Sequence, residues 1–403
     1  MTRFPADFVW GTGASSTQCE GAAPASNWID WEQAGRAPVS GDGNGFATRY
    51  HEDFAALARL GLTHHRLSIE WARIEPAPGR RDRQAIEHYR RILGTARQLG
   101  ISPWVCLHHF TLPRWFAADG GFQNPANRLG PWRRHVEFIA ETYGDLVAGW
   151  KPVNEPVAYA AGGWLGYGFP PGRNDLGEFV QALEAIHRAN IEAALILRGT
   201  GRPVASIHNL ATAHAVGEGA ETAAAMLDAV LWDSWLAPER DGELRLPGMA
   251  PVAVPDYAGV FDLIGFSYYS AIGVRADLSQ PPYPADAPRS PLGYGIWAPG
   301  LELVLDRLHR ELPNRPLLVS EYGIGTDDDT RRATYLRDGL DIAASALARG
   351  IDLRGFFHWT AVDNYEWLHG YDVRFGLFDR DRQPRESARI LAQAAAIAGS
   401  PPS

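Results

Sequence analysis

Short apolar runs alternate with longer amphipathic stretches from one end of the chain to the other. Each apolar run is bounded by turn or polar residues, a pattern typical of buried β-strands. Eight such runs are predicted to be strands: residues 8–10, 65–69, 104–108, 150–153, 204–208, 263–266, 317–320 and 355–359.

Between these runs, apolar residues recur with the spacing of one face of a helix. The predicted helices cover residues 50–60, 84–99, 132–143, 178–198, 300–311, 330–349 and 386–398. Several are followed by glycine, as at Gly61, Gly100 and Gly350, which favours a helix end. Eight strands that alternate with helices along the chain predict an α/β protein with a closed (β/α)8 TIM barrel, with an open doubly wound sheet as the rival arrangement.

The 403 residues are compatible with one barrel domain spanning 1–403, because single barrels reach this size. No linker or low-complexity tract interrupts the pattern, and the proline-rich stretch 281–291 is predicted to be one long loop. Eight units within one uninterrupted chain therefore predict a single catalytic domain.

Composition narrows the classes of function. The net charge of -9 offers no basic patch for nucleic acid or an anionic membrane, and no apolar run approaches about 18 residues. The chain starts without the long apolar stretch of a secretory signal. Two cysteines alone, Cys19 and Cys106, argue against a disulfide framework and have no metal-site spacing. We expect a cytoplasmic protein, and the sequence leaves its oligomeric state open.

Polar residues gather where the predicted strands end, which is where barrel enzymes carry their chemistry. The residues placed within or after the strands in this way are Gln18, Glu20, Arg66, Glu70, His108, His109, Asn154, Glu155, Tyr268, Tyr269, Glu321, Glu366 and Trp367.

Two of these carboxyl groups, Glu155 after the fourth strand and Glu321 after the seventh, can face each other across the barrel mouth. Glycoside cleavage needs one protonated carboxyl group for the leaving oxygen and one ionised carboxylate at the anomeric carbon. Arg66 would favour the ionised form of Glu321, whereas burial and the charge of Glu321 would raise the pKa of Glu155. A salt bridge or a helix cap would explain one such glutamate equally well. It is a poor explanation of both glutamates together.

Tryptophan is abundant, with 14 residues, and several lie beside these polar positions. Trp359 and Trp367 flank Glu366, an arrangement that favours a flat platform for a sugar ring. For Trp10 and Trp115, aromatic packing in the core is an equally good interpretation.

The motifs resemble those of glycoside hydrolase family 1, the β-glucosidase family, over essentially the whole chain. The resemblance rests on the segments FVWGTGASSTQCEG (8–21), HRLSIEW (65–71), LHHFTLP (107–113), NEP (154–156), GFSYY (265–269), SEYG (320–323) and WTAVDNYEWLHGYDVRFG (359–376).

The resemblance implies a role for each matching residue. Glu155 would be the general acid/base and Glu321 the nucleophile, supported by Arg66 and Tyr269. The remaining residues expected to bind the sugar are Gln18, His109, Asn154 (at the 2-hydroxyl), Trp359, Glu366 (at the 4- and 6-hydroxyls) and Trp367.

Four residues depart from the family pattern, and all four are expected to border the site. Phe110 stands where tryptophan is usual, Thr111 where aspartate is usual, Ser267 where asparagine is usual, and Tyr322 where asparagine is usual. Loss of the indole N–H at Phe110 removes one hydrogen-bond donor, a contact of roughly 0.5–1.5 kcal/mol, so the preferred sugar is expected to change.

The resemblance implies double displacement with retention of configuration, for which the two carboxyl groups should lie about 5–5.5 Å apart rather than about 6.5–9.5 Å. We expect β-glucosidase activity, with β-galactosides and β-fucosides also compatible. Glu366 would repel a 6-phosphate and so favours unphosphorylated sugars. Trp164, Tyr167, Tyr294 and Trp297 are candidates for the aglycone side, although each could instead pack a loop against the barrel.

Three alternatives remain at this stage. A transglycosidase would use the same glutamate pair, and a sugar-binding barrel with little turnover would be expected to lack one of them. A metal-dependent hydrolase could be suggested from the pairs 64–65 and 108–109 and the run 327–329. Adjacent histidines on a strand point to opposite faces, and the aspartate run is better explained as the start of a helix. We expect no metal and no cofactor.

Overall fold

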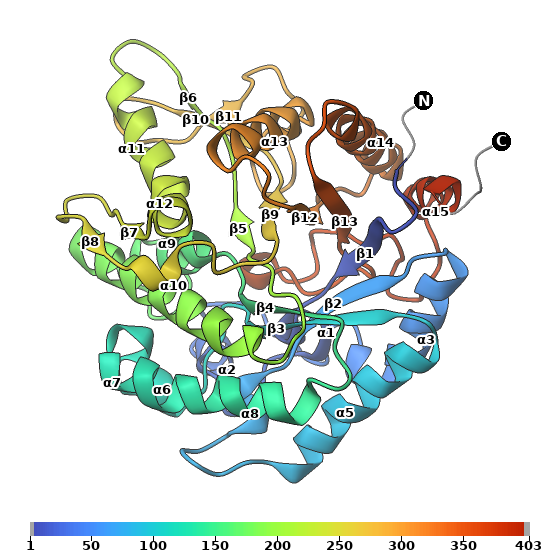
Figure 1. Ribbon diagram of the computed structural model, residues 1–403. Coiled ribbons are helices and arrows are strands. Elements are labelled where there is room, and N and C mark those ends of the chain that lie inside the picture. Colours follow the sequence, from blue (N-terminus) through green and yellow to red (C-terminus); the bar gives the residue numbers. More distant parts are fainter. Residues whose placement is uncertain (1–3, 399–403) are drawn as a thin grey trace.

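Eight parallel strands form the centre of the molecule, with helices packed around them (Figure 1). The computed structural model describes residues 4–398, so residues 1–3 and 399–403 lie outside it. The strands are β1 (Val9–Gly13), β2 (His64–Ser68), β3 (Ser102–His108), β4 (Gly149–Val153), β5 (His208–Asn209), β9 (Ile264–Tyr268), β12 (Leu317–Tyr322) and β13 (Leu353–Trp359).

Hydrogen bonding joins the strands in the order β4-β3-β2-β1-β13-β12-β9-β5. The circle closes between β4 and the segment before β5, where Trp150 N donates to Pro203 O (2.9 Å) and Ala205 N donates to Trp150 O (2.8 Å). A doubly wound sheet has two free edges and cannot show this closure, so the predicted TIM barrel is confirmed.

The fifth strand differs from its prediction. A continuous strand over 204–208 is wrong, because only β5 pairs regularly with β9, and Val204 and Ala205 form single bridges to their neighbours. The side chain of Ser206 explains the break. Its Oγ accepts from Gly265 N and donates to Gly265 O, both at 3.0 Å, and thereby replaces ladder bonds that a strand backbone would make.

The seven predicted helices are confirmed within a few residues: α3 (Phe46–Arg59), α5 (Arg83–Gln98), α8 (Arg133–Tyr143), α10 (Leu176–Arg198), α13 (Pro299–Glu311), α14 (Asp329–Ala348) and α15 (Glu386–Ala398). The glycines expected to end three of them have positive φ angles of 73° at Gly61, 79° at Gly100 and 88° at Gly350. Asp328 caps α14 by accepting from Thr330 N and Arg331 N, as the aspartate run predicted.

Three longer helices were not predicted: α9 (Pro156–Trp164), α11 (Glu221–Leu231) and α12 (Asp233–Asp241). The sequences of α9 and α11 are rich in alanine and lack a clear polar face, whereas α12 is short and contains Pro238, so periodicity alone does not reveal them. The shorter helices are α1 (Ser16–Glu20), α2 (Asn27–Gln33), α4 (Trp71–Ile74), α6 (Arg114–Ala118), α7 (Pro125–Asn127), η1 (Gly121–Gln123), η2 (Arg128–Trp132), η3 (Pro255–Tyr257) and η4 (Trp367–His369).

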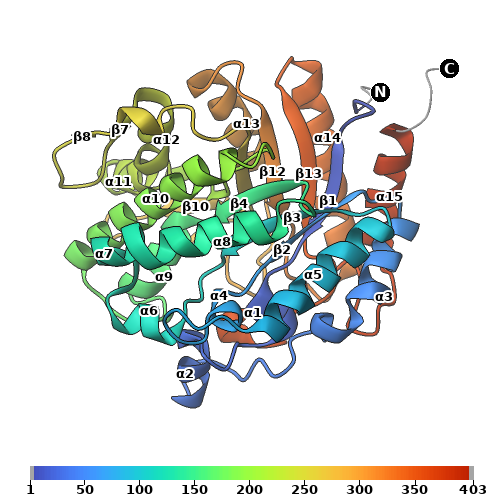
Figure 2. The same ribbon diagram turned by 60° about the horizontal axis from the view of Figure 1, so that its bottom comes forward.

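Two small sheets lie outside the barrel: β6 (Ala213–Ala215) with β10 (Ala271–Val274) and β11 (Pro282–Tyr283), and β7 (Glu243–Leu244) with β8 (Val252–Ala253). Because β11 pairs with β10, the prediction of one long loop over 281–291 is wrong in part. In Figure 2 the strands run towards the side that carries α1, α2, α4 and α6, which follow the carboxyl ends of β1, β2 and β3.

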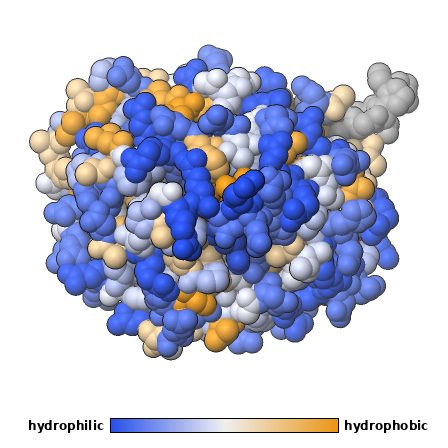
Figure 3. All heavy atoms as spheres, turned by 90° about the horizontal axis from the view of Figure 1, so that it is seen from below, coloured by the Kyte–Doolittle hydropathy of each residue, from blue (hydrophilic) through white to orange (hydrophobic). Residues whose placement is uncertain are grey.

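The core has two parts. A large apolar layer fills the space between helices and strands, and a small cluster of Trp104, Ala205, Leu318 and Phe357 fills the barrel interior. The view in Figure 3 shows a mainly hydrophilic surface with scattered apolar patches, as expected when the apolar residues are inside. None of the helices within residues 4–398 is long and apolar enough to span a bilayer.

Gly265 offers a test of the barrel seam. A Cβ at this position would overlap the Ser206 carbonyl and the Ser320 hydroxyl, so we expect Gly265→Ala to lower the free energy of unfolding by about 1–3 kcal/mol. Gly94→Ala in α5 is the matched control, because its Cβ would meet no atom within 4 Å and should stabilise the helix by about 0.5–1 kcal/mol. Urea unfolding of both variants checks this, and equal effects would contradict it.

Candidate active site

Part of the polar set predicted at the strand ends converges at the barrel mouth. Two of its members do not: the Tyr268 hydroxyl donates to Trp297 O, and His108 packs against Phe122 and Tyr159. Glu321 lies within β12 and Arg66 within β2. Glu155 is the second residue after β4 and immediately precedes α9, with a φ of 43°. All three are buried, with exposed fractions of 3%, 0% and 9%. Charges at such depth are far more strongly coupled than on the surface.

Glu321 is held by two donors. The Arg66 guanidinium forms a salt bridge to its Oε1, and the Tyr269 hydroxyl donates to its Oε2 at 2.5 Å. Burial, followed by the negative charge of Glu321, raises the pKa of Tyr269 far above its ordinary value, so this hydroxyl keeps its proton. Both contacts place hydrogen-bond donors on the oxygens of this carboxylate.

Arg66 also orients the neighbouring sugar-binding candidates. Its Nη1 donates to Asn154 Oδ1 at 3.3 Å and to His109 Nδ1 at 3.1 Å. Burial and the nearby guanidinium lower the pKa of His109 well below its usual range, so the imidazole is neutral. Because Nδ1 accepts from Arg66, the ring proton of His109 is on Nε2.

Glu155 has the opposite electrostatic environment. Burial, and then the charge of Glu321, raise the pKa of Glu155 from 4.5 to about 8. The Ser267 hydroxyl donates to its Oε1 and lowers the pKa in part. Glu155 therefore keeps its proton near neutral pH, beside Glu321, which is paired with Arg66.

A third carboxyl group, Glu366, faces the same space. Gln18 Nε2 donates to Glu366 Oε2 at 3.1 Å, and Ser15 Oγ donates to Gln18 Oε1 at 2.7 Å. Burial and the charge of Glu321 raise the pKa of Glu366 to about 8. Glu366 is thus coupled electrically to the other two carboxyl groups.

Aromatic rings line the site around His109. The rings of Trp359 and Trp367 lie nearly parallel to the imidazole, at 9° and 12°, with centroids 5.8 and 6.1 Å away. Phe110 contacts Trp367 at 5.5 Å, so a ring without an N–H donor stands at this wall. Trp10, by contrast, packs against Phe8 at 4.8 Å in the core.

Of the four departures, Phe110 and Ser267 lie at the site, one lies behind it and one lies elsewhere. Thr111 Oγ1 donates to Glu70 Oε2 at 2.9 Å, behind the sugar-facing residues. The expectation that Tyr322 borders the site is wrong: its ring stacks on Tyr335 of α14 at 4.5 Å, and its hydroxyl donates to Tyr335 O at 2.8 Å. Successive strand residues point to opposite faces, so Tyr322 points outward when Glu321 points inward.

The four candidates for the aglycone side do not form one surface. Burial, and then the charge of nearby Glu366, raise the pKa of Tyr294 above its ordinary value. Trp297 packs edge-on against Tyr283 at 5.5 Å, beside the small β10 sheet. Tyr167, which is 54% exposed, lines a different hollow against α11.

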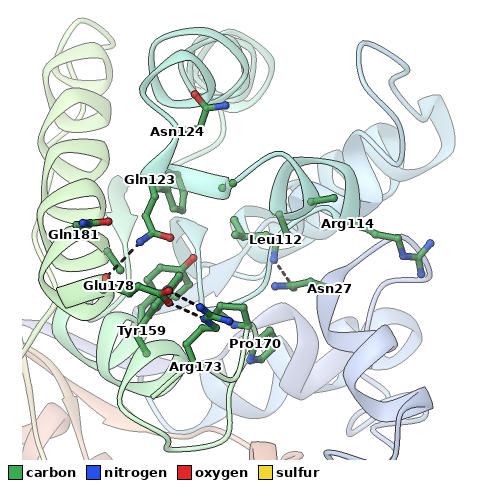
Figure 4. Close-up of a pocket in the computed structure, with 18 of the residues that line it drawn as sticks. Asn27, Leu112, Arg114, Gln123, Asn124, Tyr159, Pro170, Arg173, Glu178 and Gln181 are labelled. Carbon is green, nitrogen blue, oxygen red and sulfur yellow. Dashed lines mark hydrogen bonds and ion pairs between the residues drawn. The ribbon is translucent and has the colours of Figure 1, made fainter. Parts of the chain in front are cut away.

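Trp164 borders a pocket of about 1070 Å³ between α2, α6 and the loop after α9. Figure 4 shows Arg173 directed at Glu178 across this pocket, with Tyr159 behind the pair. On the opposite wall, Leu112 N donates to Asn27 Oδ1 at 2.9 Å. The rim is polar, and none of the three carboxyl groups described above lines the pocket.

The histidine pairs considered for a metal do not meet. His65 bonds to Thr12 at 2.8 Å and His64 to Thr63 at 2.7 Å, on opposite faces of β2. Among residues 4–398, no three His, Cys, Asp or Glu side chains are grouped to hold a metal ion.

A parallel barrel whose mouth sets a protonated carboxyl group beside an arginine-bound carboxylate belongs to the class of O-glycosyl hydrolases. The profile of glycosyl hydrolase family 1 matches residues 1–227 and 257–397. The chain therefore belongs to glycosyl hydrolase family 1, a family of retaining β-glycosidases.

The relatives agree along almost their full lengths. Beta-glucosidase A of Thermotoga maritima is 27% identical, covering 94% of this chain and 93% of its own. The bifunctional beta-D-glucosidase/beta-D-fucosidase of Bifidobacterium breve is also 27% identical, covering 96% and 95%. The solved beta-glycosidase from Pyrococcus horikoshii superposes with a TM-score of 0.90 at 29% identity, covering 98% and 95%.

The raised pKa of Glu155 predicts a pH-dependent cost in stability. In the folded state this carboxyl group keeps its proton up to pH about 8, whereas in the unfolded chain it ionises near 4.5. Unfolding therefore becomes easier as the pH rises between these values. Glu155→Gln cannot ionise, so it should be more stable than wild type by on the order of 1–3 kcal/mol at pH 7, with a smaller gain at pH 5.

Melting temperatures between pH 5 and pH 8 check this. Glu137→Gln is the control, since this exposed side chain of α8 pairs only with Arg133 and should change stability by less than about 0.5 kcal/mol. A gain from Glu155→Gln that is the same at every pH would contradict the assigned protonation.

Proposed function

We propose that the protein is a retaining β-glycosidase of the β-glucosidase type, acting on unphosphorylated β-glucosides and also on β-galactosides or β-fucosides. Glu321 is the nucleophile and Glu155 the general acid/base. The observation that carries this proposal is the opposite environment of the two groups: Glu155 has a pKa of about 8, and Glu321 is bound by Arg66 and Tyr269.

In the first step, a carboxylate oxygen of Glu321 attacks the anomeric carbon and the glycosidic C–O bond breaks. Glu155 gives its proton to the departing oxygen, so the aglycone leaves as a neutral alcohol. Ser267 donates to Oε1 of Glu155, which leaves Oε2 to carry the proton. The product of this step is a glycosyl ester on Glu321.

In the second step, Glu155 is ionised and takes a proton from water as the water oxygen attacks the anomeric carbon. The ester bond to Glu321 breaks, and Arg66 and Tyr269 receive the carboxylate again. Two inversions at one carbon give net retention of configuration.

The glycone is proposed to lie between the aromatic rings and the polar groups around His109. Its Nε2–H donates to a sugar hydroxyl, Asn154 contacts the 2-hydroxyl, and Gln18 and Glu366 bind the far side of the ring. Trp359 and Trp367 supply the stacking faces. Because the pKa of Glu366 is raised to about 8, its repulsion of a 6-phosphate grows as the pH approaches that value. The beta-glucosidase and beta-fucosidase names of the relatives also support unphosphorylated sugars.

A panel of nitrophenyl β-glycosides tests the reaction. We expect wild type to release the β-anomer, followed by NMR, and to reject 6-phosphoglucosides. Glu321→Gln should lower kcat/KM by roughly 10³-fold or more, because it removes the nucleophile. Glu155→Ala should slow substrates with poor leaving groups by about 10² to 10⁴-fold and activated aryl glycosides much less. Release of the α-anomer, or full activity in Glu321→Gln, would overturn the assignment.

Ser267→Ala tests the environment of the acid. Its hydroxyl lowers the pKa of Glu155, so its removal should let Glu155 keep its proton to higher pH. The basic limb of kcat/KM should then move up by about 0.5–1 unit. Ser345→Ala, on the exposed face of α14, should leave the profile unchanged. A basic limb that stays in place or moves down in Ser267→Ala would show that this contact does not set the proton affinity.

A further inference from the structure

Lys151 is a fully buried lysine that the proposed mechanism does not use. It lies on β4, four residues before Glu155, and none of its surface is exposed. Lysine is almost never buried to this extent unless it is paired, because removing an ammonium from water is costly. Its presence inside the barrel therefore calls for a physical reason.

The amine of Lys151 lies between the apolar interior and the carboxyl groups of the mouth. Its Nζ is 4.5 Å from the ring centroid of Phe357 and 5.6 Å from that of Trp104, both members of the inner cluster. Its one hydrogen bond among the described residues is donated to Ser320 Oγ, at 3.0 Å. The lysine thus ties β4 to β12 across the barrel.

Four titratable groups face this amine. Burial and then Arg66 lower the pKa of Lys151 well below its usual value, while Glu321 and Cys106 act in the opposite direction. Burial and then the charge of Lys151 lower the pKa of His64 to about 4. The amine therefore belongs to the same electrostatic group as Arg66 and Glu321.

Ser320, the partner of Lys151, immediately precedes Glu321 at an irregular point of β12. The register with β9 shifts between Val319 and Glu321, and the register with β13 shifts between Val319 and Tyr322. Such irregularities next to active sites re-aim a side chain. Because regular pairing is lost on both sides here, the side-chain bond from Lys151 is a direct restraint on this segment.

We propose that Lys151 is a positioning residue for Glu321, holding Ser320 so that the irregular strand segment directs the nucleophilic carboxylate at the anomeric carbon. This inference rests on the proposed function, since it assumes that Glu321 is the nucleophile. The lysine lowers stability, because an amine is desolvated among aromatic rings, and its removal should show a gain in stability together with a loss of activity.

Three variants test the proposal: Lys151→Met, Ser320→Ala and the double variant. Methionine keeps the length and apolar stem of the lysine, so Lys151→Met should melt at the same temperature as wild type or higher. Its kcat/KM should fall about 10-fold for both good and poor leaving groups, because nucleophilic attack is affected rather than proton donation. Ser320→Ala should give a similar loss, and the double variant should lose no more than the worse single variant.

The rate at which a 2-deoxy-2-fluoro-β-glycoside labels Glu321 reports the attack directly, and it should fall in parallel. Leu318→Met is the matched control, since it changes the inner cluster on the same strand without touching the Lys151–Ser320 bond, and its labelling rate should match wild type.

A labelling rate of Lys151→Met equal to that of wild type would overturn the proposal, as would losses of the two single variants that simply add. If Lys151→Met fails to fold, Ser320→Ala decides alone, and unchanged labelling in that variant sinks the idea. These outcomes are separate from failure of the proposed function, which would appear as wild type and Glu321→Gln behaving alike.

Discussion

The buried guanidinium of Arg66 is the interaction on which the barrel mouth depends. It pairs with Glu321 and donates to Asn154 and His109, so one side chain of β2 connects the ends of β3, β4 and β12. A cation in this position would be costly if it were unpaired, typically by several kcal/mol. Burial, and then the same charge, keep His109 neutral, and the bond from Arg66 gives its ring nitrogens distinct roles. Fold stability and site geometry are therefore linked through a single residue.

The barrel interior has an apolar part that stabilises the fold and a polar part that carries the proposed catalytic groups. The part away from the barrel mouth is filled by the apolar side chains of the inner cluster, Trp104, Ala205, Leu318 and Phe357. The end at the barrel mouth holds Glu155, Glu321 and Glu366, whose charges interact. The pKa values of Glu155 and Glu366 are raised to about 8. Burying these carboxyl groups lowers stability near neutral pH. The large apolar core between the helices and the strands offsets this cost.

Much of the barrel follows from the sequence, because buried strands and amphipathic helices have different periods. The positions of Glu155 and Glu321 at strand ends follow from the same pattern. Features that depend on side chains replacing backbone bonds do not, as with Ser206 in the fifth strand. The outward direction of Tyr322 was readable from strand alternation, and a lysine in the apolar run of β4 was a signal for Lys151. The aglycone candidates could not be placed, because loop conformation has no periodicity.

The two proposed catalytic groups stand on strands that are bonded into the barrel in different ways. Glu321 belongs to β12, which has ladder partners on both sides, β9 and β13, but changes register with both beside Glu321. Glu155 follows β4 at the seam closed by single bridges, where its own N–H donates to Ile207 O at 2.9 Å. The carboxylate that must form a bond is thus on a strand with neighbours on both sides, and the Lys151–Ser320 bond spans the irregular part of that strand. The group that passes protons follows a strand that is joined to its second neighbour by single bridges, so fewer backbone bonds fix its position.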